Sequence, residues 1–399
     1  MPEETITVPT IIRSNRLIGH LKGQDKGPTI FFFGGIHGNE KAGVVAIEKV
    51  FEQLQSMTET LSGSVIGIQG NTPALFQNKR FLDTDLNRLW TTKNIDRIKS
   101  KQESELGIEE KELLGIHDLI ISLLNAQSPP FYFIDLHTTS SKTLPFVTIN
   151  DALINRNFAK LFPVPIILGI EEFLEGPLLS YMNEKGYVSL GFESGQHEVI
   201  SAVDNAVAFI WLTLVNTGAL PKNEIPFFKP HFEQLENAAK GNSTFYEVEQ
   251  RFALSKNDEF IMYPGFESFQ KVKKGTILGV NNDIKVETPK SSQLFMPLYQ
   301  KQGAEAFFLI REIPKWILKI SEVLRKIKAD NLLVALPGIK WNDSGRGSLK
   351  VNLKIARFYA KSLFHLLGYR NRTIDSTHII IQNRERNARN DMYRNEPWF

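Results

Sequence analysis

The sequence predicts an α/β fold with a mixed, mostly parallel central sheet flanked by helices. Three apolar runs, Ile30–Phe33, Phe131–Leu136 and Gly186–Phe192, have the length of strands that are buried on both faces. Apolar residues recur at helical spacing between the first two runs, over Ala42–Leu54 and Leu113–Leu124. Strands that alternate with helices in this way are typical of a parallel sheet, in which each connection crosses over as a helix.

Composition limits the class of protein. The chain has 399 residues, of which 42% are hydrophobic and 11% aromatic, so it can bury a large core. It contains no cysteine, which excludes disulfides, a thiol nucleophile and thiolate metal sites and agrees with a reducing compartment. No apolar run approaches the roughly 18 residues that a membrane span needs. We therefore expect a soluble, cytoplasmic protein without contact with a membrane.

The length predicts two or three domains. We expect the α/β domain over residues 1–220, followed by a linker over 221–230. Short strand-like runs and Pro-Gly and Lys-Lys-Gly turns over 230–312 indicate a small β-domain. Residues 313–399 form a basic, partly helical extension.

The extension differs in charge from the rest of the chain. Residues 313–399 hold 17 Lys and Arg against 7 Asp and Glu, whereas residues 1–312 hold 30 against 37. Two helical patterns, Trp316–Ile327 and Leu349–Leu367, interleave basic with apolar residues. Such a segment can dock on the acidic body of its own chain, or bind nucleic acid or an acidic partner.

The first predicted strand runs into a glycine-rich turn, Gly34–Glu40, which precedes a predicted helix. Open α/β folds place their ligands at the carboxyl ends of such strands. His37 and Glu40 lie three residues apart on this turn, where an imidazole and a carboxylate can face one zinc ion. The pair alone is weak support, because a chain with eight histidines contains a His-x-x-Glu by chance about as often as not.

The second strand supplies a further candidate ligand, His137. A catalytic zinc site assembled from two strand ends has this long spacing between its ligands. Asp135, two residues earlier, is placed to orient a metal-bound imidazole. A strand-end histidine that only makes a structural hydrogen bond remains the alternative for His137.

The third strand ends at Glu193, beside Gly195. A carboxylate at this edge of the sheet is a candidate general base. An ordinary exposed glutamate is the alternative. His197 and Glu198, which follow closely, are expected at a solvated helix start.

A loop over residues 79–90 carries two arginines and two aspartates without helical or strand periodicity. Arg88 with Asn87 can hold a substrate carboxylate, because the guanidinium forms two parallel hydrogen bonds with one carboxylate. Arg80 can stabilise an oxyanion. A surface loop whose charges pair with one another is the alternative.

Several motifs, read together and in this order, resemble the succinylglutamate desuccinylase/aspartoacylase family. They are Gly34-Gly35-x-His37-Gly38-Asn39-Glu40, Arg80, Asp85-Leu86-Asn87-Arg88, Asp135-Leu136-His137-x-Thr139 and Glu193. The resemblance covers about residues 15–312. It implies a zinc carboxypeptidase-like α/β domain followed by a small β-domain that narrows the entrance to the active site.

The family pattern implies a role for each matching residue. His37, Glu40 and His137 become the ligands of one zinc ion per chain. Glu193 becomes the general acid and base that serves the zinc-bound water, and Arg80 stabilises the oxyanion.

The resemblance also implies substrate contacts. Asn87 and Arg88 bind the substrate carboxylate. Tyr299 matches a tyrosine segment of the small β-domain only loosely, so it is either a substrate contact or a tyrosine of the β-domain core. The sequence departs from the aspartoacylase pattern at one point, because Lys185 is the only basic residue between Ser180 and Glu193, where the family keeps an arginine for a second substrate carboxylate.

These observations favour a zinc-dependent amidohydrolase that acts on a C–N bond other than a peptide bond and removes the acyl group from a small N-acyl amino acid. A zinc carboxypeptidase acting on peptides would use the same ligands. A non-catalytic binding protein on the same fold is a further alternative. We expect a small-molecule substrate rather than nucleic acid, and leave open a homo-oligomer.

Overall fold

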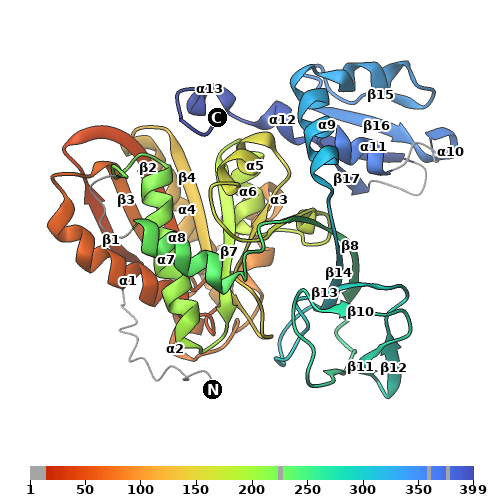
Figure 1. Ribbon diagram of the computed structural model, residues 1–399, viewed down its shortest axis with the longest axis horizontal. Coiled ribbons are helices and arrows are strands. Elements are labelled where there is room, and N and C mark those ends of the chain that lie inside the picture. The colour runs from red at the N-terminus through yellow and green to blue at the C-terminus, as the bar shows by residue number, and fades with distance from the viewer. Residues whose placement is uncertain (1–14, 223–227, 357–360, 374–377) are drawn as a thin grey trace.

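A computed structural model describes the protein over residues 15–222, 228–356, 361–373 and 378–399. Residues 223–227 of the expected linker lie outside this range. A single large sheet runs through the described part, with helices on both faces (Figure 1). The predicted fold class, a mixed and mostly parallel sheet flanked by helices, is confirmed. None of the helices in the described ranges has the length and apolar character that crossing a bilayer requires.

The large sheet has the strand order β1-β3-β2-β4-β7-β5-β6-β8-β14-β13-β10. Its strands are β1 (Leu17–Lys22), β2 (Asp25–Gly34), β3 (Ser62–Gln69), β4 (Phe131–Thr139), β5 (Phe146–Ile149), β6 (Ile166–Leu168), β7 (Val188–Gln196), β8 (Phe245–Ala253), β10 (Lys271–Val272), β13 (Ser292–Phe295) and β14 (Glu305–Glu312). Strands β3, β2, β4 and β7 are parallel neighbours. The carboxyl ends of β2, β4 and β7 therefore meet at one edge, where Gly34 pairs with Leu136 and His137 with Glu193.

Helices cover both faces of the parallel strands. One face carries α1 (Ala42–Leu54), α5 (Leu153–Ala159), α7 (Ile200–Asn216) and α8 (Phe228–Ala238). The opposite face carries α3 (Thr92–Lys99), α4 (Ile108–Ala126) and α6 (Leu178–Glu184). A short helix, α2 (Thr72–Phe76), follows β3 at the edge of the sheet where β2, β4 and β7 end.

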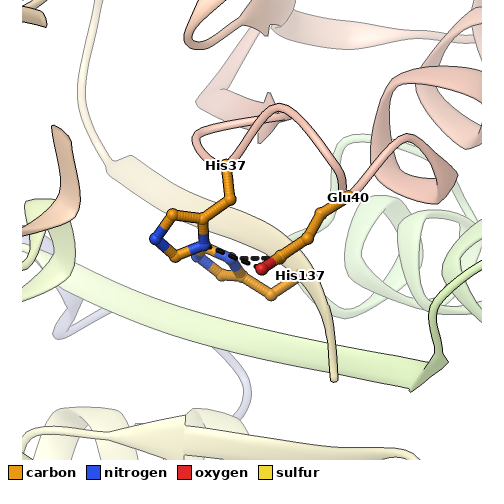
Figure 2. A group of neighbouring side chains, drawn as sticks. All are labelled: His37, Glu40 and His137. Carbon is orange, nitrogen blue, oxygen red and sulfur yellow. Dashed lines mark hydrogen bonds and ion pairs between the residues drawn. The ribbon is translucent and has the colours of Figure 1, made fainter. Parts of the chain in front are cut away.

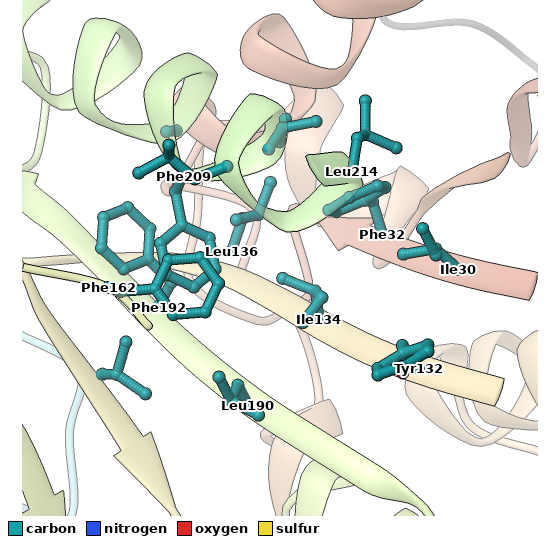
Figure 3. Packing of buried hydrophobic residues seen from close by; sticks show 14 of the residues in the cluster. Ile30, Phe32, Tyr132, Ile134, Leu136, Phe162, Leu190, Phe192, Phe209 and Leu214 are labelled. Atoms are coloured by element: carbon teal, nitrogen blue, oxygen red, sulfur yellow. The ribbon is translucent and has the colours of Figure 1, made fainter. Parts of the chain in front are cut away.

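The consecutive aromatic residues of β2 are explained by the two helical layers. Side chains alternate between the faces of a strand, so Phe32 enters the core beneath α1 and α7 while Phe31 and Phe33 enter the opposite core. In the first core Phe192 stacks on Phe209 with ring centroids 4.0 Å apart (Figure 3). A strand buried on both faces needs no polar residue, which is why this run lacks the alternation of a surface strand.

The small β-domain is continuous with the large sheet. Strand β8 pairs in parallel with β6, and β14 pairs with β8, so these strands join the α/β domain to the segment below it (Figure 1). That segment adds a sheet of β9 (Phe260–Met262), β11 (Ile277–Asn281) and β12 (Ile284–Glu287). The domain boundaries expected from the sequence remain predictions.

The C-terminal extension begins with α9 (Lys315–Lys326), which agrees with the helical pattern over Trp316–Ile327. A second sheet follows, with the order β15-β16-β18-β17. Its strands are β15 (Ile339–Trp341), β16 (Ser348–Asn352), β17 (Tyr369–Thr373) and β18 (His378–Asn383), and the remaining helices are α10 (Leu353–Ala356), α11 (Lys361–Leu366), α12 (Arg384–Asn387) and α13 (Asn390–Tyr393).

The prediction of one helix over Leu349–Leu367 is wrong in its first part. Leu349 and Val351 are buried in the core of the second sheet, with Lys350 between them, which is the period of a strand. The rest of the segment contains the short helices α10 and α11, and residues 357–360 lie outside the described range. The apolar residues that fitted the period of one helix therefore belong to a strand and two short helices.

Buried ion pairs join the extension to the α/β domain. The guanidinium of Arg325, on α9, is fully buried and contacts Asp151 at 2.9 Å and Glu385 at 2.9 Å. Arg156 of α5 contacts the same Asp151. These contacts agree with the docking of the extension on its own chain. Removing either partner of such a pair would leave a buried charge unpaired, which is strongly destabilising.

The extension also returns to the sheet through Tyr393 of α13. Its buried hydroxyl donates to the carbonyl of Phe131 and accepts a hydrogen bond from the backbone N–H of Val188. These are the first residues of β4 and β7. Trp398 packs edge-on against Tyr132 in the same place, with ring centroids 6.2 Å apart.

We expect Tyr393→Phe to lower the free energy of unfolding by about 1–3 kcal/mol, because two buried backbone groups lose their partner. The measurement is equilibrium unfolding in urea. Trp316→Ala is the matched control, because this aromatic side chain on α9 is 64% exposed and its loss should cost no more than about 0.5 kcal/mol. Equal stabilities of the two variants would contradict the prediction.

Candidate metal centre and active site

Three of the residues singled out in the sequence converge at the carboxyl edge of the sheet. His37 and Glu40 lie in the turn between β2 and α1, and His137 lies near the end of β4 (Figure 2). All three are buried, and their nitrogen and oxygen atoms come within 4.8 Å of one another. Two segments about a hundred residues apart thus share one point.

The Glu40 carboxylate lies between the two imidazoles. Its Oε1 is 2.8 Å from Nδ1 of His37, and its Oε2 is 2.9 Å from Nδ1 of His137 (Figure 2). The backbone N–H of Thr138 also donates to Oε2, at 3.1 Å. Each oxygen of the carboxylate is therefore fixed in direction.

Glycine permits the tight turn that carries His37 and Glu40. A Cβ atom at Gly38 would come within 2.1 Å of the backbone of Ala74, at the start of α2. At Gly35 the backbone has a φ of 72°, in the left-handed region that favours glycine. The turn packs against α2 only because these side chains are absent.

A second carboxylate holds the far nitrogen of each imidazole. Nε2 of His37 is 3.1 Å from Asp85, and Nε2 of His137 is 2.7 Å from Asp135. A carboxylate at Nε2 favours a proton there and leaves the lone pair of Nδ1 directed at the common point. Asp135 was anticipated in the sequence, whereas Asp85 was not.

The donor set fits a divalent metal ion. Two imidazole nitrogens with free lone pairs and one carboxylate make up three protein ligands, and this number leaves a coordination position open for a reactant. Both imidazoles carry the outer carboxylate partner that is usual for metal-bound histidine. His37, Glu40 and His137 are thus the residues that could hold a metal.

The closeness of these imidazoles and carboxylates shifts their pKa values. Burial opposes ionisation of Glu40, but the adjacent imidazoles outweigh it and hold the pKa of Glu40 well below its usual range. Burial likewise opposes protonation of His137, but Asp135 and Glu40 raise its pKa well above the usual value. Without a metal ion, the carboxylates therefore favour a positive charge at this point.

Glu193 lies at the end of β7, where it pairs in register with His137 of β4. Its Oε2 is buried and has no hydrogen-bond partner among the described residues. Burial raises the pKa of this carboxyl to about 8, against the opposing charge of His137. The unpartnered oxygen makes Glu193 a candidate for proton transfer beside the candidate ligands.

Arg80 reaches the same point from the loop that follows α2. Its guanidinium contacts Glu40 Oε1 at 3.3 Å and Asp85 at 3.1 Å, and the side chain is 14% exposed. Burial alone would lower the pKa of Arg80, but Asp85 and Glu40 raise it. The charges of this loop therefore pair with the candidate ligands and their partners, not only with one another.

Asn87 and Arg88 occupy one short 3₁₀ turn, Leu86–Arg88, which Asp85 caps. The side-chain oxygen of Asn87 accepts a hydrogen bond from the backbone N–H of Leu178 at 2.9 Å. Arg88 contacts Glu305 of β14 at 3.2 Å. A residue of the small β-domain therefore lies beside the proposed carboxylate-binding arginine.

A cavity of about 130 Å³ brings most of the candidate residues together. His37, Glu40, Arg80, Asn87, Arg88, His137 and Glu193 all line it.

The structure does not bring Tyr299 to this cavity. It is 38% exposed, and its hydroxyl donates to the backbone carbonyl of Tyr263 and accepts a hydrogen bond from the backbone N–H of Phe266, within the small β-domain. The adjacent residue, Gln300, lines the cavity instead.

The expectation that His197 is solvated is wrong. Its ring is partly buried, with Nδ1 2.7 Å from the hydroxyl of Thr138 and Nε2 3.3 Å from Gln300. Gln300 also accepts a hydrogen bond from Asn39, at 2.8 Å. Burial lowers the pKa of His197, so its neutral form is favoured. This polar cluster joins four segments that are distant in the sequence, and no spacing in the sequence indicates it.

Residues 26–199 match the model of the Succinylglutamate desuccinylase/Aspartoacylase catalytic domain. This segment belongs to that family. It holds every residue of the candidate metal centre.

Curated relatives agree over shorter stretches. The "Probable aspartoacylase" of Acaryochloris marina is 28% identical over 131 residues, which are 33% of this chain and 41% of the relative. The "Succinylglutamate desuccinylase" of Photorhabdus laumondii is 37% identical over 75 residues, which are 19% and 22% of the two chains. The matched part thus spans less than half of the length of these relatives.

Solved structures support the fold. A succinylglutamate desuccinylase/aspartoacylase from Rhodobacter sphaeroides aligns with a TM-score of 0.54 and 17% identity, over 74% of this chain and 88% of the other. A succinylglutamate desuccinylase from Vibrio parahaemolyticus aligns with a TM-score of 0.51 and 14% identity, over 76% and 94%. The shared architecture extends beyond the segment that the family model matches.

We expect Asp85→Asn to weaken zinc binding by about 10- to 100-fold, because the imidazole of His37 loses the charge that orients it. Competition with a chromophoric chelator measures the affinity of the metal-free protein. Asp83→Asn is the matched control, since Asp83 is an exposed residue of the same loop and bonds to the backbone of Ile108 instead. Unchanged zinc affinity in Asp85→Asn would argue against the metal centre.

Proposed function

We propose that the protein is a zinc-dependent hydrolase that cleaves the amide bond of a small N-acyl amino acid and releases the acyl group. One observation carries this proposal: a donor set for a metal, an unpartnered buried carboxyl group and two arginines line one cavity. The membership of residues 26–199 in a family that contains named deacylases supports it. The small cavity volume favours a small substrate over a peptide.

His37, Glu40 and His137 would hold the zinc ion. When bound, zinc supplies Lewis acidity that acidifies water and polarises a carbonyl group. Asp85 and Asp135 keep the two imidazoles in the tautomer and orientation that the ligands need.

Glu193 serves as general base and then as general acid. Its unpartnered Oε2 takes the proton from the attacking water and returns it to the leaving nitrogen. The water oxygen forms the new bond to the carbonyl carbon, and the C–N bond breaks as the nitrogen is protonated. The products are a carboxylic acid and an amine, so the step needs only water.

The arginines bind the charges of the substrate. Arg80 is directed by Asp85 and Glu40 and donates to the oxygen on which negative charge develops. Arg88 forms two hydrogen bonds with the substrate carboxylate, beside Asn87. For this, the carboxylate replaces or joins Glu305 at Arg88.

We expect Glu193→Gln to retain about one zinc per chain and to lose at least about 100-fold in kcat, because the amide cannot accept the proton. Elemental analysis measures the metal, and hydrolysis of N-acyl amino acids measures kcat. A metal chelator should abolish the wild-type activity, and added zinc should restore it. Full activity of Glu193→Gln, or a wild-type protein that binds no zinc, would refute the proposal.

We expect Arg88→Lys to raise KM by about 10-fold or more with a smaller change in kcat, because a lysine cannot form the two parallel hydrogen bonds. Steady-state kinetics over a range of N-acyl amino acid concentrations separate the two constants. Arg97→Lys is the matched control, since Arg97 is 48% exposed on α3 and pairs with Glu110. A KM equal to that of the control would show that Arg88 does not bind the carboxylate.

A further inference from the structure

The cavity has a charged half and an apolar half. The charged half holds the candidate ligands, Glu193 and the two arginines. The rest of the lining includes aliphatic and aromatic residues, of which Ile170, Leu174 and Met296 pack with Phe308 in one cluster and Leu179 comes from α6, together with the polar residues Thr148, Asn150 and Ser180. A substrate that spans the cavity therefore meets charges at one end and apolar surface at the other.

The strand order explains this division. Strand β7 separates β4, which bears His137, from β5, which bears Ile149. Farther along the same sheet, β14 contributes Phe308. The cavity residues Ile170, Met296 and Phe308 thus follow or belong to strands that lie beyond β7, on the side of the sheet away from β4.

The described residues that line the cavity include two cations, Arg80 and Arg88. Arg80 already contacts the carboxylates of Glu40 and Asp85. Arg88 lies at the cavity wall with Glu305 as its ion-pair partner. The cavity therefore offers a guanidinium to one substrate carboxylate.

Among the described residues, this side of the cavity also includes an acidic residue, Glu171. Glu171 lies in the 3₁₀ turn Ile170–Glu172, and its Oε1 accepts a hydrogen bond from the backbone N–H of Asp151 at 3.2 Å. The described residues that line this side include no cation to pair with a second substrate carboxylate, so the desolvation of that carboxylate would be uncompensated. Such a group would be rejected.

Lys185 does not supply the missing cation. Its ammonium lies 5.1 Å from the centre of the Tyr181 ring, and it is not among the described residues that line the cavity. The segment before Glu193 instead contributes Leu179 and Ser180 to the wall. The segment that lacks the arginine of the aspartoacylase pattern therefore contributes a leucine and a serine, but no cation, to the cavity wall.

From this arrangement we infer that the substrate carries one carboxylate, and that its acyl group and side chain are otherwise uncharged and mainly apolar. The inference rests on the proposed function, since it specifies the substrate of the same site. It distinguishes the protein from an enzyme for aspartyl or succinyl compounds, which carry a further carboxylate.

The test compares substrates of equal shape and different charge, with the zinc-loaded full chain. N-acetylleucine is compared with N-acetylaspartate, and N-(4-methylpentanoyl)alanine with N-succinylalanine, because an isopropyl group and a carboxylate have the same branching. We expect kcat/KM to be at least about 10-fold higher for the neutral member of each pair. Equal or reversed preference in either pair would overturn this inference but leave the hydrolase proposal intact. No hydrolysis of any of the four would refute the hydrolase proposal, and the inference with it.

Variants at the apolar wall test the cause of the selectivity. In Leu174→Arg, a new cation should raise the ratio of kcat/KM for N-succinylalanine to that for N-(4-methylpentanoyl)alanine by at least about 5-fold. Leu174→Gln is the matched control, which removes the same leucine without adding charge and should leave this ratio within about 2-fold of the wild-type value. Thermal unfolding confirms that each variant is folded, and an unchanged ratio in Leu174→Arg would overturn the inference.

Discussion

The burial of the Glu40 carboxylate between two imidazoles is the constraint on which the site depends. A carboxylate removed from water must be compensated, and here the partners are His37, His137, the N–H of Thr138 and the guanidinium of Arg80. These partners come from the turn after β2, the end of β4 and the loop after α2. The positions of three segments therefore follow from one buried charge.

The surroundings of Glu40 carry an excess of acidic groups. Asp85 and Asp135 hold the outer nitrogens of the two imidazoles, while Arg80 is the guanidinium that contacts this cluster most directly. Such an arrangement is costly in an empty protein interior, and a divalent cation at the shared point would offset it. Burial raises the pKa of Glu193, and the neighbouring negative charge of Glu40 adds to this effect.

The sequence predicted those parts of the site that depend on strand ends. Continuous apolar runs identified β2, β4 and β7, and the first polar residues after them included His37, His137 and Glu193. The contacts of Asp85, His197 and Gln300 were not predictable in the same way, because they depend on how loops from distant segments fold back over the sheet edge. Tyr299 illustrates the same limit, since a loosely matching motif did not reveal that its hydroxyl bonds to Tyr263 and Phe266.

The pairing of strands that are far apart in the sequence could not be predicted from the periodicity of apolar residues either. Leu349 and Val351 fit a helical pattern and a strand equally well until their partners in β18 are known. The pairing of β8 with β6 likewise depends on residues nearly eighty positions apart. Local pattern identifies an element when one face is buried by its neighbours in sequence, and it becomes ambiguous when the burial comes from elsewhere.

The contact of Tyr393 with the first residues of β4 and β7 has a consequence for the order of folding. Its partner Phe131 precedes it by 262 residues. At synthesis rates of about 5–20 residues per second, this gap corresponds to about ten seconds to a minute. During that time the nascent chain exposes Tyr132 and the open ends of two strands whose other ends bear His137 and Glu193. The carbonyl of Phe131 and the N–H of Val188 therefore lack this partner until the last residues of the chain have been synthesised.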